Sequence, residues 1–408
     1  MQINSLPSEF KTARPILQTI EGAGFEAYFV GGSVRDTILK DPIHDVDIAT
    51  SAYPSEVKAL FHKTVDTGIK HGTVMILDHH HKYEVTTFRT ESGYQDFRRP
   101  DKVTFVRSLS EDLKRRDFTV NALALKEDGT VVDLFSGLND LAQHVLRAVG
   151  SPEERFHEDA LRMMRAVRFA SKLDFTIEKQ TEAAIQHHAK LLQKIAVERI
   201  RVEFEKMMMG QNPLKGVRYF LETGLYAYCP RLNGQKKALS RMLGLNASLQ
   251  LANETQVWLF VCRILGLSAQ ACPTFLKAWK TSNDLNQAVK AGLTFLEALD
   301  NQTVNAHLLF QTGERYLKEA LTVQKIFDVS FDPDQYLVAY KKLPIKSSKE
   351  LAINGRDLIT THLVTPGPDL GRVLTALQEG VLNGTYQNQS SELISAAKTM
   401  LTNKEESD

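Results

Sequence analysis

The sequence predicts an α/β domain in the N-terminal part of the chain and a wholly helical remainder. Residues 1–147 mix short runs of β-branched and aromatic residues with short helix-like stretches. Beyond Ser151 the apolar residues recur at helical spacing, and strand-like runs become rare. Such a change of pattern along one chain indicates an α/β head followed by an all-α region.

The composition allows several domains with hydrophobic cores. The chain has 408 residues, of which 43% are hydrophobic, enough for about two to four domains. Its formal net charge is +1, so any affinity for nucleic acid has to come from a local basic face. The three cysteines are far apart, which predicts neither a disulfide framework nor a zinc site. With no signal-like N-terminus and no apolar run of roughly 18–20 residues, we expect a cytoplasmic protein without a membrane anchor.

The first predicted strand runs into a glycine turn. Residues 26–30 (EAYFV) are rich in aromatic and β-branched side chains and alternate as a strand does. Gly31 and Gly32 break this strand, and Ser33 begins a helix-like stretch that ends near Lys40. Backbone amides at such a turn can approach an anion closely, so the turn favours phosphate binding.

Two aspartates one residue apart follow this turn. Residues 45–49 (DVDIA) are predicted to form the next strand, in which alternate residues share a face. Asp45 and Asp47 are therefore expected to project together, about 6–7 Å apart, while Val46 and Ile48 face the core. Paired carboxylates beside an anion-binding turn suit Mg²⁺ and a triphosphate. The alternative, for the Asp-x-Asp pair alone, is an ordinary solvated end of a strand.

A hairpin is predicted next, from residues 73–77 and 83–88 with a polar tip between them. The three adjacent histidines at this tip, residues 79–81, are expected to be a solvated loop, because their side chains cannot converge on one ion. Glu84 on the second strand is a candidate third acidic group near the metals; an ordinary surface glutamate is the alternative. No Gly-x-x-x-x-Gly-Lys-Ser/Thr motif is present, which disfavours kinase or ATPase chemistry.

Two polar segments follow the hairpin. Residues 89–102 (RTESGYQDFRRPDK) show no period and are predicted to be a long mobile loop beside the site, with Glu91, Arg98 and Arg99 as its charged candidates. Residues 114–121 (KRRDFTVN) then lead into an apolar run. Arg115 and Arg116 are candidates for phosphate binding, and a merely solvated basic pair is the alternative.

One long helix is predicted from Ser151 to about Ser171. Ser, Pro and Glu stand at its start in the order that favours a helix N-terminus. At 100° per residue one face is expected to pack in the core, and it carries Ala160, Met164, Val167 and Ser171. The opposite side carries Glu158, Arg162, Arg165 and Phe169.

On this helix Asp159 and Arg162 are neighbours at i,i+3 and present an acceptor beside a fork of donors. Cytosine and adenine both show an amino donor beside a ring-nitrogen acceptor, so this pair fits both bases. Guanine and uracil show the reversed order and would leave both protein groups unpaired, which is costly. The alternative is an ordinary salt bridge on a helix surface, which is worth little.

Together these motifs resemble the nucleotidyltransferase superfamily of DNA polymerase β and poly(A) polymerases, and in particular the class II CCA-adding enzymes, the bacterial tRNA nucleotidyltransferases. The matching segments are residues 31–36 with Asp45 and Asp47, 91–100, 115–117 with Asn121, 158–165, 198–204, 354–358 and 367–371. In that family the first segment, with the two aspartates, is the metal motif, and 91–100 is the flexible loop implicated in the switch from CTP to ATP. The segment 115–117 with Asn121 is the ribose and triphosphate motif. The base-reading helix is 158–165, its supporting helix is 198–204, and the last two segments belong to a tail domain.

The resemblance implies a polymerase β-like nucleotidyltransferase head at residues 1–147, a helical neck at 148–210, a helical body at 211–300 and a helical tail at 301–408. It also implies addition of C, C and A to the 3′ end of tRNA, from CTP and ATP, with two Mg²⁺ ions. The tRNA 3′ end, acceptor stem and elbow would be the partners, with no membrane and no obligatory protein partner.

The resemblance also implies a role for each candidate residue. Asp45 and Asp47 would be catalytic and hold the metals, with Glu84 as the possible third ligand. Asp159 and Arg162 would select the base. The remaining nucleotide-binding candidates are Gly32, Ser33, Arg35, Arg116, Asp117, Asn121 and Arg165.

Other activities remain open at the level of the sequence. Bacterial poly(A) polymerases carry a basic Gly-Arg-Arg/Lys-Phe stretch after the metal motif, whereas residues 67–74 here read TGIKHGTV. CC-adding relatives lack the flexible loop, which this chain has, but an A-adding enzyme is harder to exclude. Intact Asp45 and Asp47 argue against a non-catalytic RNA-binding protein. A small-molecule nucleotidyltransferase would not need the long helical region.

Overall fold

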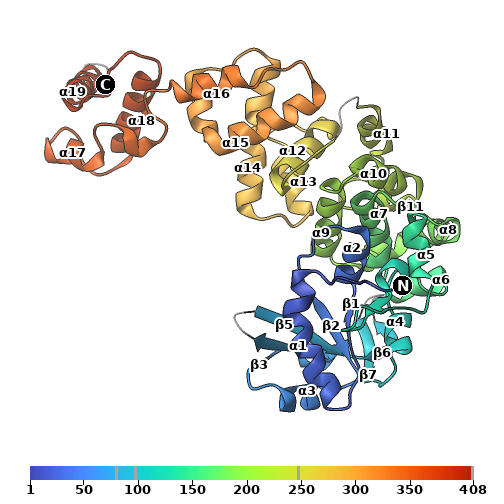
Figure 1. The fold of residues 1–408 in the computed structure, drawn as a ribbon. Helices are drawn as coiled ribbons and strands as arrows, with labels where there is room; N and C mark the ends of the chain where they lie inside the picture. Colours follow the sequence, from blue (N-terminus) through green and yellow to red (C-terminus); the bar gives the residue numbers. More distant parts are fainter. Residues whose placement is uncertain (79–80, 96–98, 246–248, 406–408) are drawn as a thin grey trace. The chain divides into compact units, whose positions relative to one another are not determined.

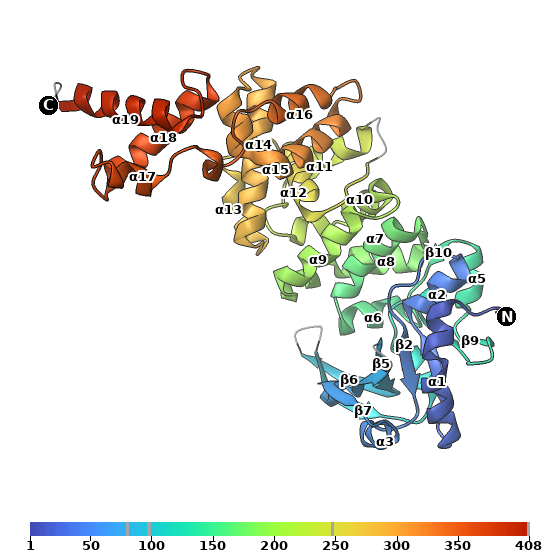
Figure 2. The same cartoon turned by 60° about the vertical axis from the view of Figure 1, so that its left-hand side comes forward.

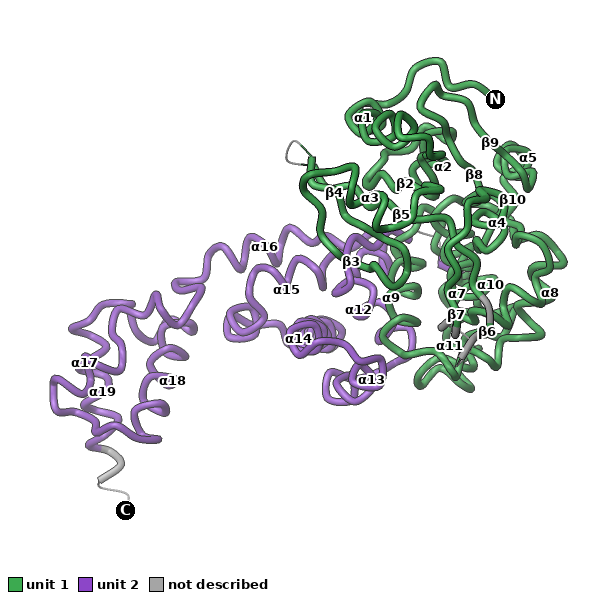
Figure 3. The backbone as a smooth tube through the Cα atoms, turned by 90° about the horizontal axis from the view of Figure 1, so that it is seen from below, with its two compact units in different colours: residues 1–243 green, residues 244–408 purple. Residues whose placement is uncertain are grey.

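The structure is a computed structural model that describes residues 1–408 except 79–80, 96–98, 246–248 and 406–408. The chain divides into two compact units, residues 1–243 and residues 244–408 (Figure 3). All the described strands lie in the first unit, and the second is built from helices. The predicted α/β head followed by a helical region is confirmed.

A seven-stranded mixed sheet forms the framework of the first unit (Figure 1). Its strand order is β3-β4-β5-β2-β1-β8-β9. Neighbouring strands are antiparallel except β2 and β5, which are parallel. The strands are β1 (Ala27–Val30), β2 (Asp47–Thr50), β3 (Thr64–Gly68), β4 (Thr73–Asp78), β5 (His81–Thr87), β8 (Leu123–Leu125) and β9 (Val131–Asp133).

Apolar side chains from the helices and the sheet make the core of the head. Helix α1 (Ser8–Gly22) packs against β1, with the rings of Phe10 and Phe29 4.5 Å apart. Helix α3 (Pro54–Leu60) packs against β4 and β5. A buried cluster below the site includes Val30, Ala49 and Phe88. This core holds the strand ends that carry the predicted site residues.

Most of the predicted local structure of the head is confirmed. The first strand is β1, and the helix-like stretch is α2 (Gly32–Leu39), which ends at Lys40 in a left-handed conformation. The hairpin is β4–β5, with Val74 opposite Val85. His79 and His80 lie outside the described residues, and His81 is the first residue of β5.

The strand with the two aspartates begins later than predicted. Strand β2 starts at Asp47, so Asp45 lies in the segment before it. Asp47 pairs with Val30, the last residue of β1, and at Gly31 the chain turns with φ of 76°. Because β1 ends there, Asp45 has no backbone partner on β1. Ile48 is buried as predicted, whereas Val46 is only half-buried.

The polar segment after the hairpin is a β-ribbon, so the prediction of an irregular loop there was wrong. Strands β6 (Arg89–Gln95) and β7 (Arg99–Phe105) pair antiparallel with each other and form a separate two-stranded sheet (Figure 2). Backbone hydrogen bonds between the two strands stabilise this ribbon. A strand pair that is polar on both faces shows no hydrophobic alternation, so the sequence pattern did not reveal it.

Helices complete the first unit. They are α4 (Leu109–Lys114), α5 (Gly137–Ala142), α6 (Pro152–Glu158), α7 (Leu161–Leu173), α8 (Lys179–His188), α9 (Val197–Met208), α10 (Pro213–Glu222) and α11 (Lys236–Ser240). Short strands β10 (Val145–Leu146) and β11 (Thr176–Ile177) pair in parallel between them. Short 3-10 turns occur at Ile69–His71, Thr119–Asn121, Ala189–Lys194, Leu225–Tyr228 and Arg241–Gly244.

The single helix predicted from Ser151 to Ser171 is two helices, α6 and α7, with a break between them. Asp159 at the break is extended, with φ of −137° and ψ of 101°. Its Oδ1 accepts a hydrogen bond of 3.0 Å from the amide of Leu161 and so caps the start of α7. Short acidic side chains favour such caps over the helix interior. The predicted core stripe is nevertheless confirmed, since Ala160, Met164, Val167 and Ser171 are fully buried.

The second unit is a set of helices with its own apolar core. Trp258 and Trp279 are fully buried there, with ring centroids 5.0 Å apart. Among the described residues, no helix combines the length and the apolar character needed to span a membrane. The helices are α12 (Glu254–Leu265), α13 (Cys272–Ala278), α14 (Asn283–Asp300), α15 (Ala306–Phe327), α16 (Asp334–Lys341), α17 (Gly355–Thr360), α18 (Pro368–Leu382) and α19 (Ser390–Glu405), with a 3-10 turn at Ser348–Glu350.

Candidate active site

A pocket of about 1110 Å³ lies in the first unit, lined by the edge of the sheet and by α7 and α9. It brings together residues that are far apart in the sequence. Of the predicted site residues, all but Glu84, Arg98 and Arg99 line it. Those present are Gly32, Ser33, Arg35, Asp45, Asp47, Glu91, Arg116, Asp117, Asn121, Asp159, Arg162 and Arg165.

Asp47, which lines this pocket, and Glu84 stand side by side in the sheet. They are partners in the register of the parallel strands β2 and β5, so their side chains leave the same face of the sheet. Partial burial raises the pKa of the Asp47 carboxyl; the negative charges of Glu84 and Asp45 add to this rise, and the charge of Arg116 opposes it. Carboxylate oxygens gathered in this way are well suited to a hard divalent cation, which prefers oxygen ligands.

The glycine turn lies close to this carboxylate cluster. Gly31 has a positive φ, and a side chain there would meet Asp47 Oδ2 and Arg116 Nη1, both 3.5 Å from the Cβ position. After the turn, Ser33 Oγ donates a hydrogen bond of 3.1 Å to the carbonyl of Val30. The start of α2 thus presents backbone amides to the pocket, next to a guanidinium group.

Arg35 is a buried residue of the pocket lining, and two partners set the direction of its side chain. Its Nε donates to Asp36 Oδ1 at 2.7 Å, and its Nη1 donates to Asn121 Oδ1. The guanidinium also lies over the ring of Phe169, 5.1 Å from the centroid. A positive charge held in this way is preorganised for an anion in the pocket.

Arg115 and Arg116 are anchored rather than solvated, so the alternative of a free basic pair is wrong. Asp112, which is 1% exposed, forms ion pairs with both, at 2.8 Å to Arg115 and 3.3 Å to Arg116. Arg116 also donates to the carbonyl of Asn121. Both guanidinium groups line the pocket.

Asp117 connects the head to α7. Its Oδ1 accepts from the amide of Phe118 at 2.8 Å and from Asn121 Nδ2 at 3.0 Å, and its Oδ2 accepts from Arg165 Nε at 2.7 Å. Burial alone would raise the pKa of Asp117. The charge of Arg165 and the hydrogen bonds from Asn121 and Arg165 outweigh burial and lower this pKa to about 2.

The break between α6 and α7 turns Asp159 and Arg162 toward the pocket. Arg162 is 8% exposed, and its Nη1 donates to Glu158 Oε2 at 2.8 Å while its Nη2 donates to the carbonyl of Arg115 at 2.9 Å. Arg162 therefore does form an i,i+4 ion pair, with Glu158, but the pair is largely buried rather than solvated. Burial raises the pKa of Asp159, and the charge of Arg162 opposes this rise.

Several pocket residues were not among the candidates from the sequence. Arg168 forms an ion pair with Glu203 of α9 and lies over the ring of Phe169, 4.0 Å from its centroid. Lys172 lies 3.5 Å from Asp36 Oδ2, and Arg199 reaches the pocket from α9. The spacing of basic residues along α7 was a usable signal for Arg168 and Lys172. Arg199 lies on another helix and carried no comparable signal.

Four candidates from the hairpin and the ribbon are left to describe. Glu84 lines a second pocket of about 670 Å³, which it shares with Asp45 and Asp47. Glu91 does line the main pocket and forms ion pairs with Arg89 at 2.8 Å and with Arg115 at 3.2 Å. Arg98 lies outside the described residues, and the side chain of Arg99 is not described either.

Comparison with family models gives a consistent picture along the chain. A model described as the poly A polymerase head domain matches residues 27–147. A model for domain 2 of tRNA nucleotidyltransferases matches residues 249–397, and a third, for a segment of polymerase A, matches residues 174–235.

Comparison with individual proteins extends the similarity to nearly the whole chain. The chain is 59% identical to a CCA-adding enzyme of Limosilactobacillus reuteri over 97% of this chain and 98% of the relative. It is similar to the crystal structure of the Bacillus stearothermophilus CCA-adding enzyme in complex with CTP, with a TM-score of 0.87, 40% identity and coverage of 99% and 100%. A Thermotoga maritima CCA-adding enzyme complexed with tRNA shares the fold, with a TM-score of 0.63, 21% identity and coverage of 98% and 97%.

Proposed function

The chain belongs to the family of CCA-adding enzymes, and we propose that the pocket lined by Asp47, Arg116 and Arg162 is where it adds C, C and A to the 3′ end of tRNA. The enzyme is a tRNA nucleotidyltransferase that uses CTP and ATP. One observation carries the assignment of the site. A single pocket is lined by acidic groups, by cations that suit phosphate, and by the pair Asp159 and Arg162, whose chemistry suits C and A.

Asp45 and Asp47 are assigned to hold two Mg²⁺ ions, with Glu84 as the third acidic group. Their carboxylate oxygens, and the position of Glu84 beside Asp47 in the parallel strand pair, support this assignment. When bound, the two ions would acidify the attacking 3′-hydroxyl and neutralise charge on the leaving pyrophosphate. In each addition the 3′-oxygen forms a bond with the α-phosphorus while the bond to the bridging oxygen of the β-phosphate breaks; the hydroxyl proton passes to solvent.

The triphosphate is assigned to the start of α2 and to the buried cations. Gly32 and Ser33 offer backbone amides at the helix N-terminus, while Arg35 and Arg116 supply charge held in place by Asp36 and Asp112. Asp117 and Asn121 hydrogen-bond to each other and are assigned to the ribose.

Asp159 and Arg162 are assigned to select the base. Asp159 would accept from the amino group of C or A, and Arg162 would donate to the adjacent ring nitrogen. Glu158 and the carbonyl of Arg115 hold the Arg162 guanidinium in position, so the geometry of this contact does not depend on a nucleic-acid template. Guanine or uracil would leave both groups unpaired.

The tRNA 3′ end is assigned to the second pocket, because Asp45 and Asp47 line both pockets and so stand between the two reactants. The helical segments would contact the acceptor stem and elbow. We propose the division into head (1–147), neck (148–210), body (211–300) and tail (301–408) for these roles. No obligatory protein partner is needed, and the three free, buried cysteines fit a reducing cytoplasm.

The function is tested with a tRNA transcript that ends at its discriminator base, incubated with Mg²⁺ and CTP, ATP or both. Products are resolved at single-nucleotide length. Two additions with CTP alone, and a third only when ATP is also present, are expected. A long ladder with ATP alone would instead indicate a poly(A) polymerase. Two additions at most would indicate a CC-adding enzyme, and one addition confined to tRNA ending in CC an A-adding enzyme.

A further inference from the structure

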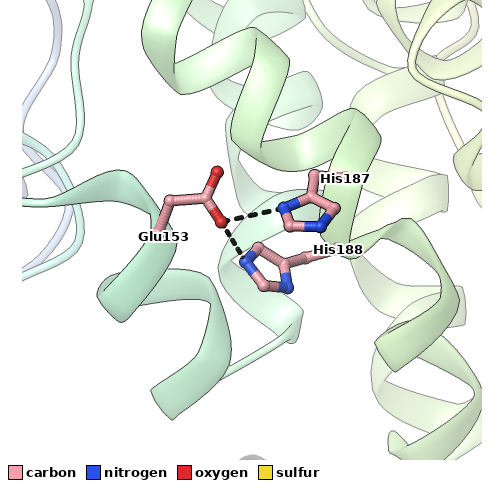
Figure 4. Close-up of side chains that lie close together, drawn as sticks. All are labelled: Glu153, His187 and His188. Atoms are coloured by element: carbon pink, nitrogen blue, oxygen red, sulfur yellow. Dashed lines mark hydrogen bonds and ion pairs between the residues drawn. The ribbon is translucent and has the colours of Figure 1, made fainter.

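Outside the main pocket, three side chains from two helices of the first unit converge on one point (Figure 4). Glu153 lies in the first turn of α6, and His187 and His188 end α8. Glu153 Oε2 lies 3.1 Å from His187 Nδ1 and also forms a hydrogen bond with His188 Nε2. One ligand atom from each residue lies within 4.8 Å of the other two.

This convergence depends on where α8 ends. Successive residues of an α-helix point about 100° apart, so two adjacent histidines on a regular helix do not face the same atom. At His188 the α-helix gives way to a 3-10 turn, with φ of −95° and ψ of 1°. The two imidazole rings lie 4.7 Å apart, and both direct a nitrogen at Glu153.

We infer that Glu153, His187 and His188 form a binding site for a transition-metal dication of the zinc class. Two imidazole nitrogens with one carboxylate oxygen are a common donor set for Zn²⁺, with bonds of about 2.0–2.2 Å. In a tetrahedral site such bonds place the ligand atoms roughly 3.3 Å apart. The 3.1 Å between Glu153 Oε2 and His187 Nδ1 is close to this spacing, and all three ligand atoms lie within 4.8 Å of one another, so side-chain rotations would admit the ion.

The site differs in chemistry from the carboxylate cluster of the active site. Nitrogen donors favour zinc-class ions, whereas Mg²⁺ prefers oxygen ligands only. The His187 side chain is 73% exposed and that of Glu153 is 53% exposed, so an ion can enter from solvent and a water can complete its coordination. His157 lies one turn beyond Glu153 on α6, with its ring 6.3 Å from that of His188.

A plain ion pair between protonated histidines and Glu153 is the competing explanation. The end of α8 favours positive charge and the start of α6 favours negative charge, which would draw either histidine to Glu153. Such exposed ion pairs are weak, however, and they do not require both imidazole rings to hydrogen-bond to the same carboxylate oxygen. A bound ion requires three ligand atoms gathered around one point, which these residues supply, and it would cross-link α6 to α8.

Zinc titration of the untagged, full-length protein tests the site, with an excess of Mg²⁺ present to occupy the active-site carboxylates. The titration is made in a background in which residues 79–81, the run of three histidines, are replaced by alanine. Isothermal titration is expected to show one equivalent of Zn²⁺ bound at micromolar concentration. His188→Ala and Glu153→Gln are each expected to weaken binding roughly tenfold or more.

The matched control is His62→Ala, which removes an exposed histidine of the same unit and is expected to leave Zn²⁺ binding unchanged. Circular dichroism and CTP addition verify that each variant is folded. Co²⁺ absorption gives a second readout, because coordination by histidine nitrogen changes its visible spectrum. Absence of zinc binding in the background protein, or binding that His188→Ala and Glu153→Gln leave intact, would overturn the inference in favour of a simple ion pair.

Discussion

Arg165 of α7 donates a hydrogen bond of 2.7 Å from its Nε to Oδ2 of Asp117, in the turn after α4. The same carboxylate accepts from Asn121 through its other oxygen, and Asn121 in turn accepts from Arg35. A continuous chain of hydrogen bonds therefore runs from the proposed base-selecting helix to the cation below the triphosphate site. The parts that would choose the base and hold the phosphates are fixed relative to each other within the first unit.

This relationship predicts a pH-dependent stability. The folded-state pKa of Asp117 is about 2, below its ordinary value, so its ionised form stabilises the protein above about pH 4. That contribution, on the order of 2 kcal/mol at neutral pH, is lost as the pH falls toward 2. The difference in free energy of unfolding between wild type and Asp117→Asn should therefore narrow with acid.

Urea unfolding followed by circular dichroism measures this difference at each pH. Trp258 and Trp279 both lie in the second unit, so tryptophan fluorescence follows that unit and shows whether the effect of the variant is confined to the first unit. If the difference in free energy of unfolding between wild type and Asp117→Asn stays constant between pH 4 and pH 2, the ionised Asp117 carboxylate does not stabilise the fold as predicted.

Replacing either of the two aspartates that we propose to bind metal should stop the chemistry without preventing substrate binding. Asp45→Ala and Asp47→Ala are each expected to lower the rate of both C and A addition by roughly 10³-fold or more, because stabilisation of the transition state by the ions is lost. Single-turnover kinetics and filter binding of tRNA separate the two effects. Asp41→Ala, an exposed aspartate just upstream, is the control and should retain activity.

Glu84 should assist the two aspartates, because it stands beside Asp47 in the parallel strand pair. Glu84→Gln keeps the shape of the side chain and removes its charge. It is expected to lower activity by roughly 10- to 100-fold and to raise the Mg²⁺ concentration needed for half-maximal rate. Unchanged Mg²⁺ dependence would mean that Glu84 is an ordinary surface residue; Glu111→Gln, on an exposed site of α4, is the matched control.

The β6–β7 ribbon is tied to the pocket through Glu91, which pairs with Arg89 and Arg115. The family resemblance implicates this segment in the switch from CTP to ATP. Glu91→Gln should therefore impair addition of A to tRNA ending in CC more than addition of the two C residues. Equal losses for both steps, measured as kcat/KM with CTP and with ATP, would argue that the ribbon has no part in the switch.

The sequence was sufficient to predict the local features that depend on neighbouring residues. The strand before Gly31, the β4–β5 hairpin and the core stripe with Met164 all follow from hydrophobic periodicity. Likewise, the Asp-x-Asp pair and two arginines of α7, Arg162 and Arg165, were recognisable because chemistry of this kind needs particular residue types at short spacing.

Features that depend on tertiary contacts were missed or misplaced. Asp159 is compatible with a helix interior, and only its hydrogen bond to the Leu161 amide and the separate packing of α6 and α7 reveal the break. Asp45 lies outside β2, whose pairing with β1 and with β5 starts only at Asp47, and the pattern of residues 45–49 does not show where this pairing starts. Arg199 enters the pocket from α9, and nothing in its local sequence distinguishes it from a surface arginine.

The central claim is that protein side chains alone choose the base. The most direct measurement compares kcat/KM for CTP, ATP, UTP and GTP in wild type, Arg162→Ala and the control Arg147→Ala, an arginine of the same unit outside the pocket. The account predicts that Arg162→Ala loses roughly 10- to 100-fold of its discrimination against UTP and GTP, while Arg147→Ala keeps it. Full discrimination retained by Arg162→Ala would contradict the account.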